Sequence, residues 1–230
     1  MLCERYDILT ATAWILGHSR NTGTPKLPEN LANKTANECT EKELLQVVEI
    51  GQAAGLKLYP FKLGTQLLPR IRRTLGFLHS ISFETMLDVG SGRGVFLIPF
   101  MKEFPFVKVT SIDILEKRII FLRELSNGGF TQMHAEHKNI CEKPFPDKTF
   151  DVITMLEVLE HIPAVEKAIE AAVKMAKKYV VLTVPSKPDN NPEHIHLLTK
   201  DKLTKIFKSI GCEKLHFDGV EGHLFMIAVI

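Results

Sequence analysis

The fold class of this chain follows from the stretch LDVGSGRG, residues 87–94. An apolar run of strand length, Thr85–Val89, leads directly into it, and a helix is predicted to begin in the run from Val95 to Phe100. Glycines let the backbone turn tightly and approach a ligand closely, and the N-terminus of a helix offers N–H donors. The stretch therefore predicts a ligand-binding turn between a strand and a helix. A glycine turn that only packs the strand against the helix is the alternative.

The residues beyond Ser82 alternate between short apolar runs and segments of helical length. Four runs have the length and composition of strands: Thr85–Val89, Lys108–Ile112, Phe150–Leu156 and Tyr179–Val184. Such alternation is typical of a parallel sheet. The end of the chain differs, because Glu213–Asp218 and His223–Ile230 are two strands joined by a glycine-containing turn, which predicts an antiparallel hairpin at one edge. We therefore expect a doubly wound, mostly parallel α/β fold.

The N-terminal part of the chain shows helical patterns. Ile8–Gly17 is far shorter than the ~20 apolar residues of a membrane span, and we expect it to form a packed helix. The polar segment His18–Thr40 is rich in turn residues and predicts a flexible loop or lid. Thr40 and Glu43 form a capping-box pattern that predicts a helix from Glu41. A further helix is expected over Leu67–His79.

Length and composition set the class of protein. With 230 residues, the chain can hold one α/β domain plus an appendage, so we expect a helical extension or lid at residues 1–81 and the main domain at 82–230. Hydrophobic residues at 45% and charged residues at 24% indicate a globular protein, and a net charge of +2 is too small to favour nucleic acid. The four cysteines form no CxxC pair, which favours a reducing cytoplasmic location.

A second motif supports the glycine turn. The run Val109–Ile112 ends in Asp113, an acid at the C-terminal tip of the second predicted strand. Its two oxygens could accept hydrogen bonds from both hydroxyls of a ribose at that edge of the sheet. The acid and the turn together are more specific for a nucleoside than either alone. A surface aspartate that caps the helix beginning near Leu115 is the alternative.

With these motifs, the chain resembles the class I S-adenosylmethionine-dependent methyltransferases, in their EVLEH-containing subgroup. The resemblance covers roughly Met86–Ile230 and rests on LDVGSGRG, the acid in SIDI, the run PFPDKTFDVITMLEVLEHIP and the terminal hairpin. It implies a Rossmann-like sheet of seven strands. It also implies that S-adenosylmethionine is the cofactor and that a methyl group passes to an oxygen or nitrogen atom of an acceptor.

The resemblance also implies a set of cofactor-binding residues. In this family the glycine loop lies against the methionine part of the cofactor, and the acid matching Asp113 holds the ribose. Asn139 and Ile140 match the positions that flank the adenine, although an aspartate is commoner at the first of them. The candidate cofactor-binding residues are Asp88, Gly90, Ser91, Gly92, Gly94, Asp113, Ile114, Asn139, Ile140 and Met155.

Two other functions share parts of this pattern. Nicotinamide dehydrogenases also have a glycine loop and a ribose-binding acid, but their fingerprint is GxGxxG, whereas this loop is GxGxG and is followed later by EVLEH. A regulator that binds the cofactor without catalysis is the other alternative. It would bind the cofactor tightly and lack an acceptor pocket.

Methyl transfer needs a base only when the acceptor must lose a proton. Glu157, Glu160 and His161 follow the strand Phe150–Leu156 with the spacing of one helix face, and His194 and His196 follow the next predicted strand. We expect the two groups to meet at the C-terminal edge of the sheet. The catalytic candidates are His161, Glu157 and His194, with His161 the preferred base because its ordinary pKa is about 6.5. A purely structural role for Glu160 and His161 is the alternative.

The ExxEH spacing carries a narrower resemblance. With the later His194, it looks like the metal site of small-RNA ribose 2′-O-methyltransferases, in which two glutamates and two histidines hold a divalent ion. The same EVLEH also occurs in ubiquinone-type O-methyltransferases. The resemblance implies a candidate site for magnesium, manganese or zinc made by Glu157, Glu160, His161 and His194, and an alternative function as a metal-dependent RNA ribose 2′-O-methyltransferase.

The acceptor itself is not identified by the sequence. We expect a small molecule rather than RNA, and we expect no DNA or membrane partner. The sequence leaves the oligomeric state open.

Overall fold

The computed structural model describes residues 5–61 and 67–230, and these form two compact units. Unit 1 comprises the described parts of residues 1–67, 92–106 and 115–135, and unit 2 comprises residues 68–91, 107–114 and 136–230. The two units are not continuous in sequence, because residues 92–106 and 115–135 belong to unit 1 together with the N-terminal helices. That residues 1–81 act as an extension or lid stays a prediction.

The strands form one seven-stranded sheet in the order β3-β2-β1-β4-β5-β7-β6. Strand β1 pairs with β2 and β4 in parallel, β4 pairs with β5 in parallel, and β7 runs antiparallel to both β5 and β6. The fold class is therefore confirmed. The strands are β1 (Thr85–Val89), β2 (Lys108–Asp113), β3 (Met133–His137), β4 (Phe150–Leu156), β5 (Ala176–Pro185), β6 (Lys214–Val220) and β7 (His223–Val229).

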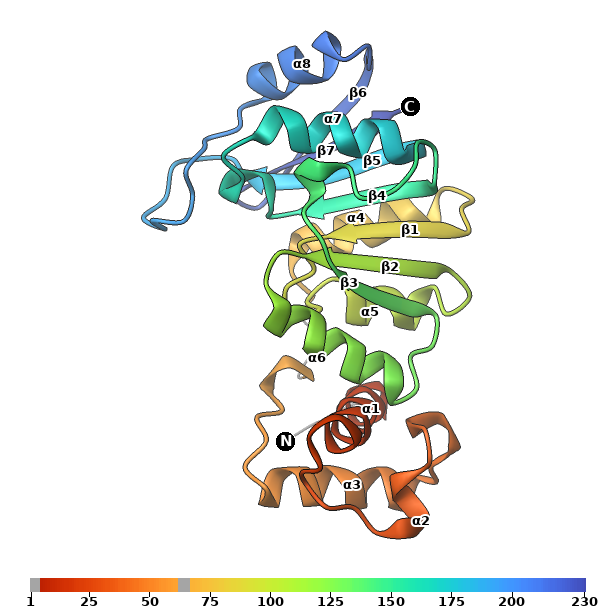
Figure 1. Cartoon of the computed structure of the whole chain (residues 1–230). Helices are drawn as coiled ribbons and strands as arrows, with labels where there is room; N and C mark the ends of the chain where they lie inside the picture. The colour runs from red at the N-terminus through yellow and green to blue at the C-terminus, as the bar shows by residue number, and fades with distance from the viewer. Residues whose placement is uncertain (1–4, 62–66) are drawn as a thin grey trace. The chain divides into compact units, whose positions relative to one another are not determined.

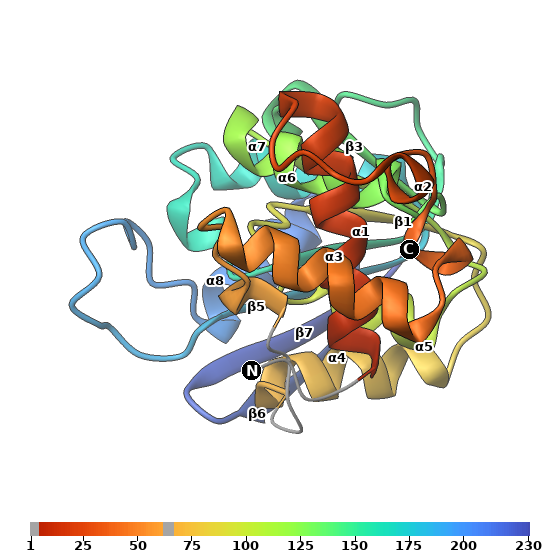
Figure 2. The same ribbon diagram turned by 90° about the horizontal axis from the view of Figure 1, so that it is seen from below.

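The central strands of unit 2 are almost wholly buried. All residues of β4 except the last are buried, as are the last four of β1. A strand covered on both faces needs apolar side chains on both, and for this reason these runs lack polar alternation. Figures 1 and 2 show helices α7 (Val165–Met175) and α4 (Pro69–His79) on opposite faces of these strands. Unit 2 also contains α8 (Lys200–Ser209) and the short 3₁₀ helices η3 (Ile140–Glu142) and η4 (Leu159–His161).

Unit 1 is helical, and its α1 packs against both α3 and α6. Figure 1 shows α1 between these two helices. Thr40 caps α3, and Thr40 and Glu43 exchange side-chain and backbone hydrogen bonds, which confirms the predicted capping box. The helices of unit 1 are α1 (Arg5–Thr22), α2 (Glu29–Ala32), η1 (Ala36–Glu38), α3 (Glu41–Ala53), η2 (Tyr59–Phe61), α5 (Leu97–Glu103) and α6 (Glu116–Asn127).

The predicted loop over His18–Thr40 is partly wrong. Helix α1 continues to Thr22, and the rest of the segment includes α2 and η1. The extension of α1 has a physical cause in a buried carboxylate on α6. Glu124 accepts hydrogen bonds at 2.9 Å from the side chains of Trp14, His18 and Asn21. These donors recur about once per turn, so the carboxylate of Glu124 stabilises two successive turns of α1, and the helix continues beyond His18.

Two glycines allow α1 and α6 to cross closely. A Cβ on Gly17 would lie 1.8 Å from the carbonyl oxygen of Glu124, and a Cβ on Gly128 would lie 1.7 Å from that of Ala13. Both neighbours are backbone atoms, which cannot move aside as a flexible side chain can. Glycine at these positions therefore fixes the distance between the two helices.

Among the described residues, no helix is long and apolar enough to cross a membrane.

Replacing Gly128 by alanine should destabilise the protein, because the added methyl group would collide with the backbone of α1. We expect the free energy of unfolding to fall by about 1–3 kcal/mol or more, the usual cost of overpacking. Urea denaturation followed by circular dichroism measures it. Gly76→Ala is the matched control, since a Cβ at this helical glycine meets nothing within 4 Å. Equal stability of the two variants would contradict the close crossing.

Candidate functional site

The glycine turn leaves the C-terminal end of β1 through Gly90. Its φ of +68° lies in the left-handed region that favours glycine. Its N–H donates to the carbonyl oxygen of Ile112 at 2.8 Å, which ties the turn to β2. A Cβ at this position would lie 2.6 Å from Cγ2 of Val158, the second residue of EVLEH. The turn therefore needs glycine for its backbone angle and for the close packing of the EVLEH segment.

Asp88 lies beneath this turn and is 3% exposed. The hydroxyl of Thr154 on β4 donates to its carboxylate at 2.6 Å. Burial raises the pKa of Asp88 to about 6, although hydrogen bonds from Ser91 and Thr154 oppose the shift. Ser91 in turn shares a hydrogen bond of 2.5 Å with Ser111 on β2. Asp88 and Ser91 thus connect the turn to the strands on both sides of β1.

The predicted ribose-binding acid, Asp113, is the last residue of β2. Since Ile112 pairs with Val89, Asp113 follows at the same edge of the sheet as Gly90. The next side chain, Ile114, is 65% exposed and offers apolar surface at that edge. The structure therefore brings Asp88, Gly90, Ser91, Asp113 and Ile114 to one end of the adjacent strands β1 and β2.

The remaining cofactor candidates differ in their surroundings. Asn139 caps η3, and its side-chain oxygen accepts the N–H of Cys141 at 3.0 Å. The side chains of Ile140 and Met155 are buried in the core of unit 2. Gly92 and Gly94 belong to unit 1, and their φ angles of +58° and +76° show that the left-handed backbone continues along the loop.

The segment Glu157–His161 does not form the predicted helix face. Glu157 has a φ of +59°, which breaks any helix, and only Leu159–His161 forms a 3₁₀ turn. The expectation that Glu157, Glu160 and His161 share one helical face is therefore wrong. A left-handed angle is uncommon and costly at a residue other than glycine, and it is also found at Lys143, Lys148 and Glu221.

The two loops that follow β4 and β5 do converge. Three hydrogen bonds join them. The N–H of Ile195 donates to the carbonyl of Glu160 at 3.0 Å. The ring of His161 bonds the carbonyl of Glu193 at 3.0 Å, and the ring of His196 bonds the carbonyl of Ile162 at 3.1 Å. The predicted meeting of the two groups is confirmed. His196 links the two loops through its hydrogen bond to Ile162.

The convergence brings Glu160, His161 and His194 together. One ligand atom from each lies within 4.8 Å of those of the other two, and the two imidazole rings are 4.8 Å apart. Each ring already uses its Nδ1: that of His161 bonds the carbonyl of Glu193, and that of His194 bonds Oδ2 of Asp189 at 2.7 Å. Because both partners are acceptors, both Nδ1 atoms carry hydrogen, and Nε2 is the nitrogen left to act as base or ligand.

Glu160 is the buried member of this cluster, with 0% exposure. Neither carboxylate oxygen has a hydrogen-bond partner in another residue within residues 5–61 and 67–230. Burial raises the pKa of Glu160 to about 8 and the charge of Glu157 adds to the shift, while a hydrogen bond with its own backbone and the charge of Arg70 oppose it. Buried carboxylates are normally paired or coordinated. Glu160 therefore offers a buried carboxylate that no other described residue occupies.

Glu157 lies outside the cluster and has another partner. Its Oε2 is 2.9 Å from Nε2 of His223, the first residue of β7, whose Nδ1 is 2.9 Å from the carbonyl oxygen of Glu221. His223 therefore bridges Glu157 and the turn at Glu221. The other oxygen of Glu157 is buried and has no partner among the described residues.

Sequence reasoning missed His223 and Asp189. His223 was identified only as the start of the last strand, although the hairpin register offered a signal. It pairs with Pro185 at the end of β5, which brings it to the edge where Glu157 leaves β4. Asp189 precedes His194 by five residues in a turn-rich stretch, and no spacing rule links them.

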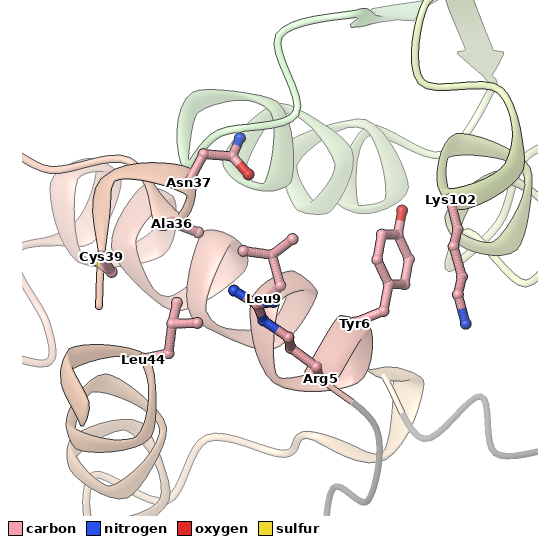
Figure 3. Close-up of a pocket in the computed structure, with 8 residues that line it drawn as sticks. All are labelled: Arg5, Tyr6, Leu9, Ala36, Asn37, Cys39, Leu44 and Lys102. Carbon is pink, nitrogen blue, oxygen red and sulfur yellow. The ribbon is translucent and has the colours of Figure 1, made fainter. Parts of the chain in front are cut away.

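Unit 1 contains a separate cavity of about 460 Å³, shown in Figure 3. None of the predicted site residues lines it. Burial raises the pKa of the Cys39 thiol in its wall, which makes that sulfur a poor nucleophile. The lining residues are Arg5, Tyr6, Leu9, Ala36, Asn37, Cys39, Leu44 and Lys102.

Curated relatives of the chain share its sequence over limited lengths. The small-subunit ribosomal RNA methyltransferase G of Oceanobacillus iheyensis is 39% identical over 88 residues, which is 35% of this chain and 36% of the relative. The enzyme of the same name from an Exiguobacterium species is 32% identical over 132 residues, or 54% and 55%. The chain spans between about a quarter and about half the length of the curated relatives it matches.

Solved structures share the fold. A SAM-dependent methyltransferase from Aquifex aeolicus has a TM-score of 0.59 and 21% identity, with 76% of this chain and 100% of that chain covered. Magnesium protoporphyrin IX methyltransferase from Synechocystis, with bound SAH, has a TM-score of 0.56 and 15% identity, with 69% and 81% covered. The methyltransferase-domain family matches residues 61–216, about two thirds of the chain. The predicted methyltransferase family is thereby confirmed, while its EVLEH-containing subgroup stays a prediction, and the chain belongs to the methyltransferase-domain family.

Proposed function

We propose that this chain transfers the methyl group of S-adenosylmethionine to an oxygen or nitrogen atom of an acceptor. The observation that carries the proposal is the edge shared by β1 and β2, where a turn that needs glycine at position 90 lies beside Asp113. A glycine turn and an acid at adjacent strand ends suit a nucleoside, since the backbone can approach it and the acid can hold its ribose.

Each residue of this edge has a proposed task. The two oxygens of Asp113 accept hydrogen bonds from the ribose hydroxyls, and the exposed side chain of Ile114 covers one face of the adenine. Asp88 is buried, so its task is to hold the turn through Thr154. The sulfonium is a good leaving group, and the main contribution of the protein is alignment of donor and acceptor.

The acceptor side is proposed to lie at the converging loops. Val158 packs against Gly90, so the EVLEH segment begins beside the cofactor turn. His161 is exposed and has its Nε2 available, which makes it the proposed base for an acceptor that must lose a proton. Glu157 and His194 are proposed to bind or orient the acceptor.

Two classes of acceptor each have one observation in their favour. The net charge of +2 favours a small molecule, because proteins that bind RNA are usually more basic. The names of the curated relatives favour ribosomal RNA. We keep the small molecule as the proposal and RNA as the alternative.

A divalent metal is the second proposal, and the cluster fits one. Glu160 supplies a buried carboxylate without a partner, and His161 and His194 supply imidazoles whose Nδ1 atoms are already bonded to acceptors, as is usual for metal-binding histidines. We propose these three as the ligands, without Glu157. Two imidazoles and one carboxylate suit manganese or zinc better than magnesium. When bound, such an ion lowers the pKa of an acceptor hydroxyl.

Cofactor binding tests the main proposal. We expect calorimetric titration to show binding of S-adenosylmethionine and of its demethylated product, and Asp113→Ala to weaken binding by about tenfold or more, because charged hydrogen bonds to the ribose are lost. Asp147→Ala removes the same charge from an exposed loop and serves as the control. Equal affinity of both variants would remove Asp113 from the site, and no binding by the natural protein would overturn the proposal.

An assay of methyl transfer distinguishes the two acceptor classes from each other, and an enzyme from a regulator that only binds the cofactor. Protein and labelled S-adenosylmethionine are incubated with small-subunit ribosomal RNA or with a small-molecule extract, each with chelator or with added manganese. We expect label in the small-molecule fraction, and more of it with manganese. Label in the RNA would support the alternative acceptor. Equal methyl transfer with and without chelator would contradict a role for the metal. No transfer to either fraction would favour a regulator that binds the cofactor without catalysis.

Replacing Glu160 by glutamine should stabilise the metal-free protein at alkaline pH. The folded state holds the Glu160 proton more tightly than the unfolded state does. The stability that this proton contributes to the natural protein is therefore lost as pH rises from about 4.5 to about 8. Glutamine keeps the shape and never ionises. The difference in melting temperature between Glu160→Gln and the natural protein should therefore grow over this range and level off above it. A constant difference from pH 5 to pH 9 would argue against the raised pKa.

A further inference from the structure

We infer that Asp189 is a positioning residue that fixes the imidazole of His194 for metal binding through Nε2. The inference rests on the metal site proposed above. Asp189 matches no motif of the sequence, and it enters through contacts that only the structure reveals.

The contact between Asp189 and His194 is direct. Oδ2 of Asp189 is 2.7 Å from Nδ1 of His194, a short distance for a hydrogen bond from nitrogen to a carboxylate. A hydrogen on Nδ1 leaves the lone pair of the neutral ring on Nε2. The carboxylate therefore selects the tautomer and the orientation in which Nε2 is the ligand atom.

The carboxylate is itself held in place. The second oxygen of Asp189 accepts the N–H of Asn191 at 2.9 Å, and the side-chain oxygen of Asn191 accepts the N–H of Glu193 at 3.0 Å. The N–H of His194 donates to the carbonyl of Asn191 at 3.0 Å. The turn from Asp189 to His194 is thus closed by hydrogen bonds within itself, and both oxygens of Asp189 are occupied.

The partners of the two imidazoles differ in chemistry, since Asp189 offers a carboxylate to His194. An ionised carboxylate on the far nitrogen raises the basicity of an imidazole ligand more than a neutral carbonyl does. His161 has only the carbonyl of Glu193 in this position. The two histidines are therefore unequal, and His194 is expected to be the stronger ligand.

The test is titration of the purified full chain with Co²⁺ alone, at fixed pH, by calorimetry and by visible absorption. The absorption bands report the ligands around the ion, independently of activity. We expect Asp189→Ala to weaken Co²⁺ binding by about 10- to 100-fold, the usual effect of losing such a partner. Asp189→Asn keeps an oxygen that can accept from Nδ1, and it should recover part of this loss.

The matched control is Glu193→Ala. It removes one negative charge from the same loop and leaves the backbone carbonyl that bonds His161. We expect it to bind Co²⁺ with the affinity and spectrum of the natural protein. Equal weakening by Glu193→Ala and Asp189→Ala would show a general effect of charge and would overturn the inference, while the metal site would stand.

The remaining outcomes are also decisive. If Asp189→Ala binds as tightly as the natural protein, Asp189 has no positioning role. If neither the natural protein nor Glu160→Gln binds Co²⁺ in the titration, the proposed metal site is wrong, and the inference about Asp189 is wrong with it. Circular dichroism of each variant checks the fold, and Asp189→Asn keeps the question answerable if Asp189→Ala unfolds.

Discussion

The contact between Gly90 and Val158 is the constraint on which the site depends. It joins the turn at the end of β1 to the segment that leaves β4, and a Cβ on Gly90 would force Val158 to shift. Because β1 and β4 are parallel neighbours, their ends share one edge, and the missing side chain lets the two loops touch there. The cofactor residues and the residues of EVLEH are close because of this packing.

Much of the sheet could be predicted from the sequence. Strands β1 and β4 begin and end at the predicted residues, because buried parallel strands are continuous apolar runs bounded by turns. The strand Met133–His137 was implied only by the family resemblance, since its alternating burial leaves a weaker apolar signal. The end of α1 was missed for another reason. It is fixed by Glu124, more than a hundred positions away in sequence, and no local pattern reveals such a partner.

The candidate site was predicted only where strand ends decided it. Asp113 and the loop at Gly90 follow directly from the ends of β2 and β1, and the convergence of Glu160, His161 and His194 follows from the shared edge. The position of Glu157 could not be predicted, because a helical spacing was assumed where the backbone takes a left-handed turn. That turn points Glu157 towards His223, a partner supplied by the antiparallel hairpin.

The two proposed roles of His161 compete for one atom. Its Nδ1 is committed to the carbonyl of Glu193, so proton abstraction and metal binding would both use the lone pair on Nε2. A metal-bound His161 cannot also take a proton from the acceptor. With the ion in place, the proton would have to pass to another group, and Glu157 is a candidate, since one of its oxygens has no partner among the described residues. Without the ion, a protonated Glu160 is neutral and leaves His161 free to act as the base. In this proposal, the occupancy of the cluster decides which residue handles the proton.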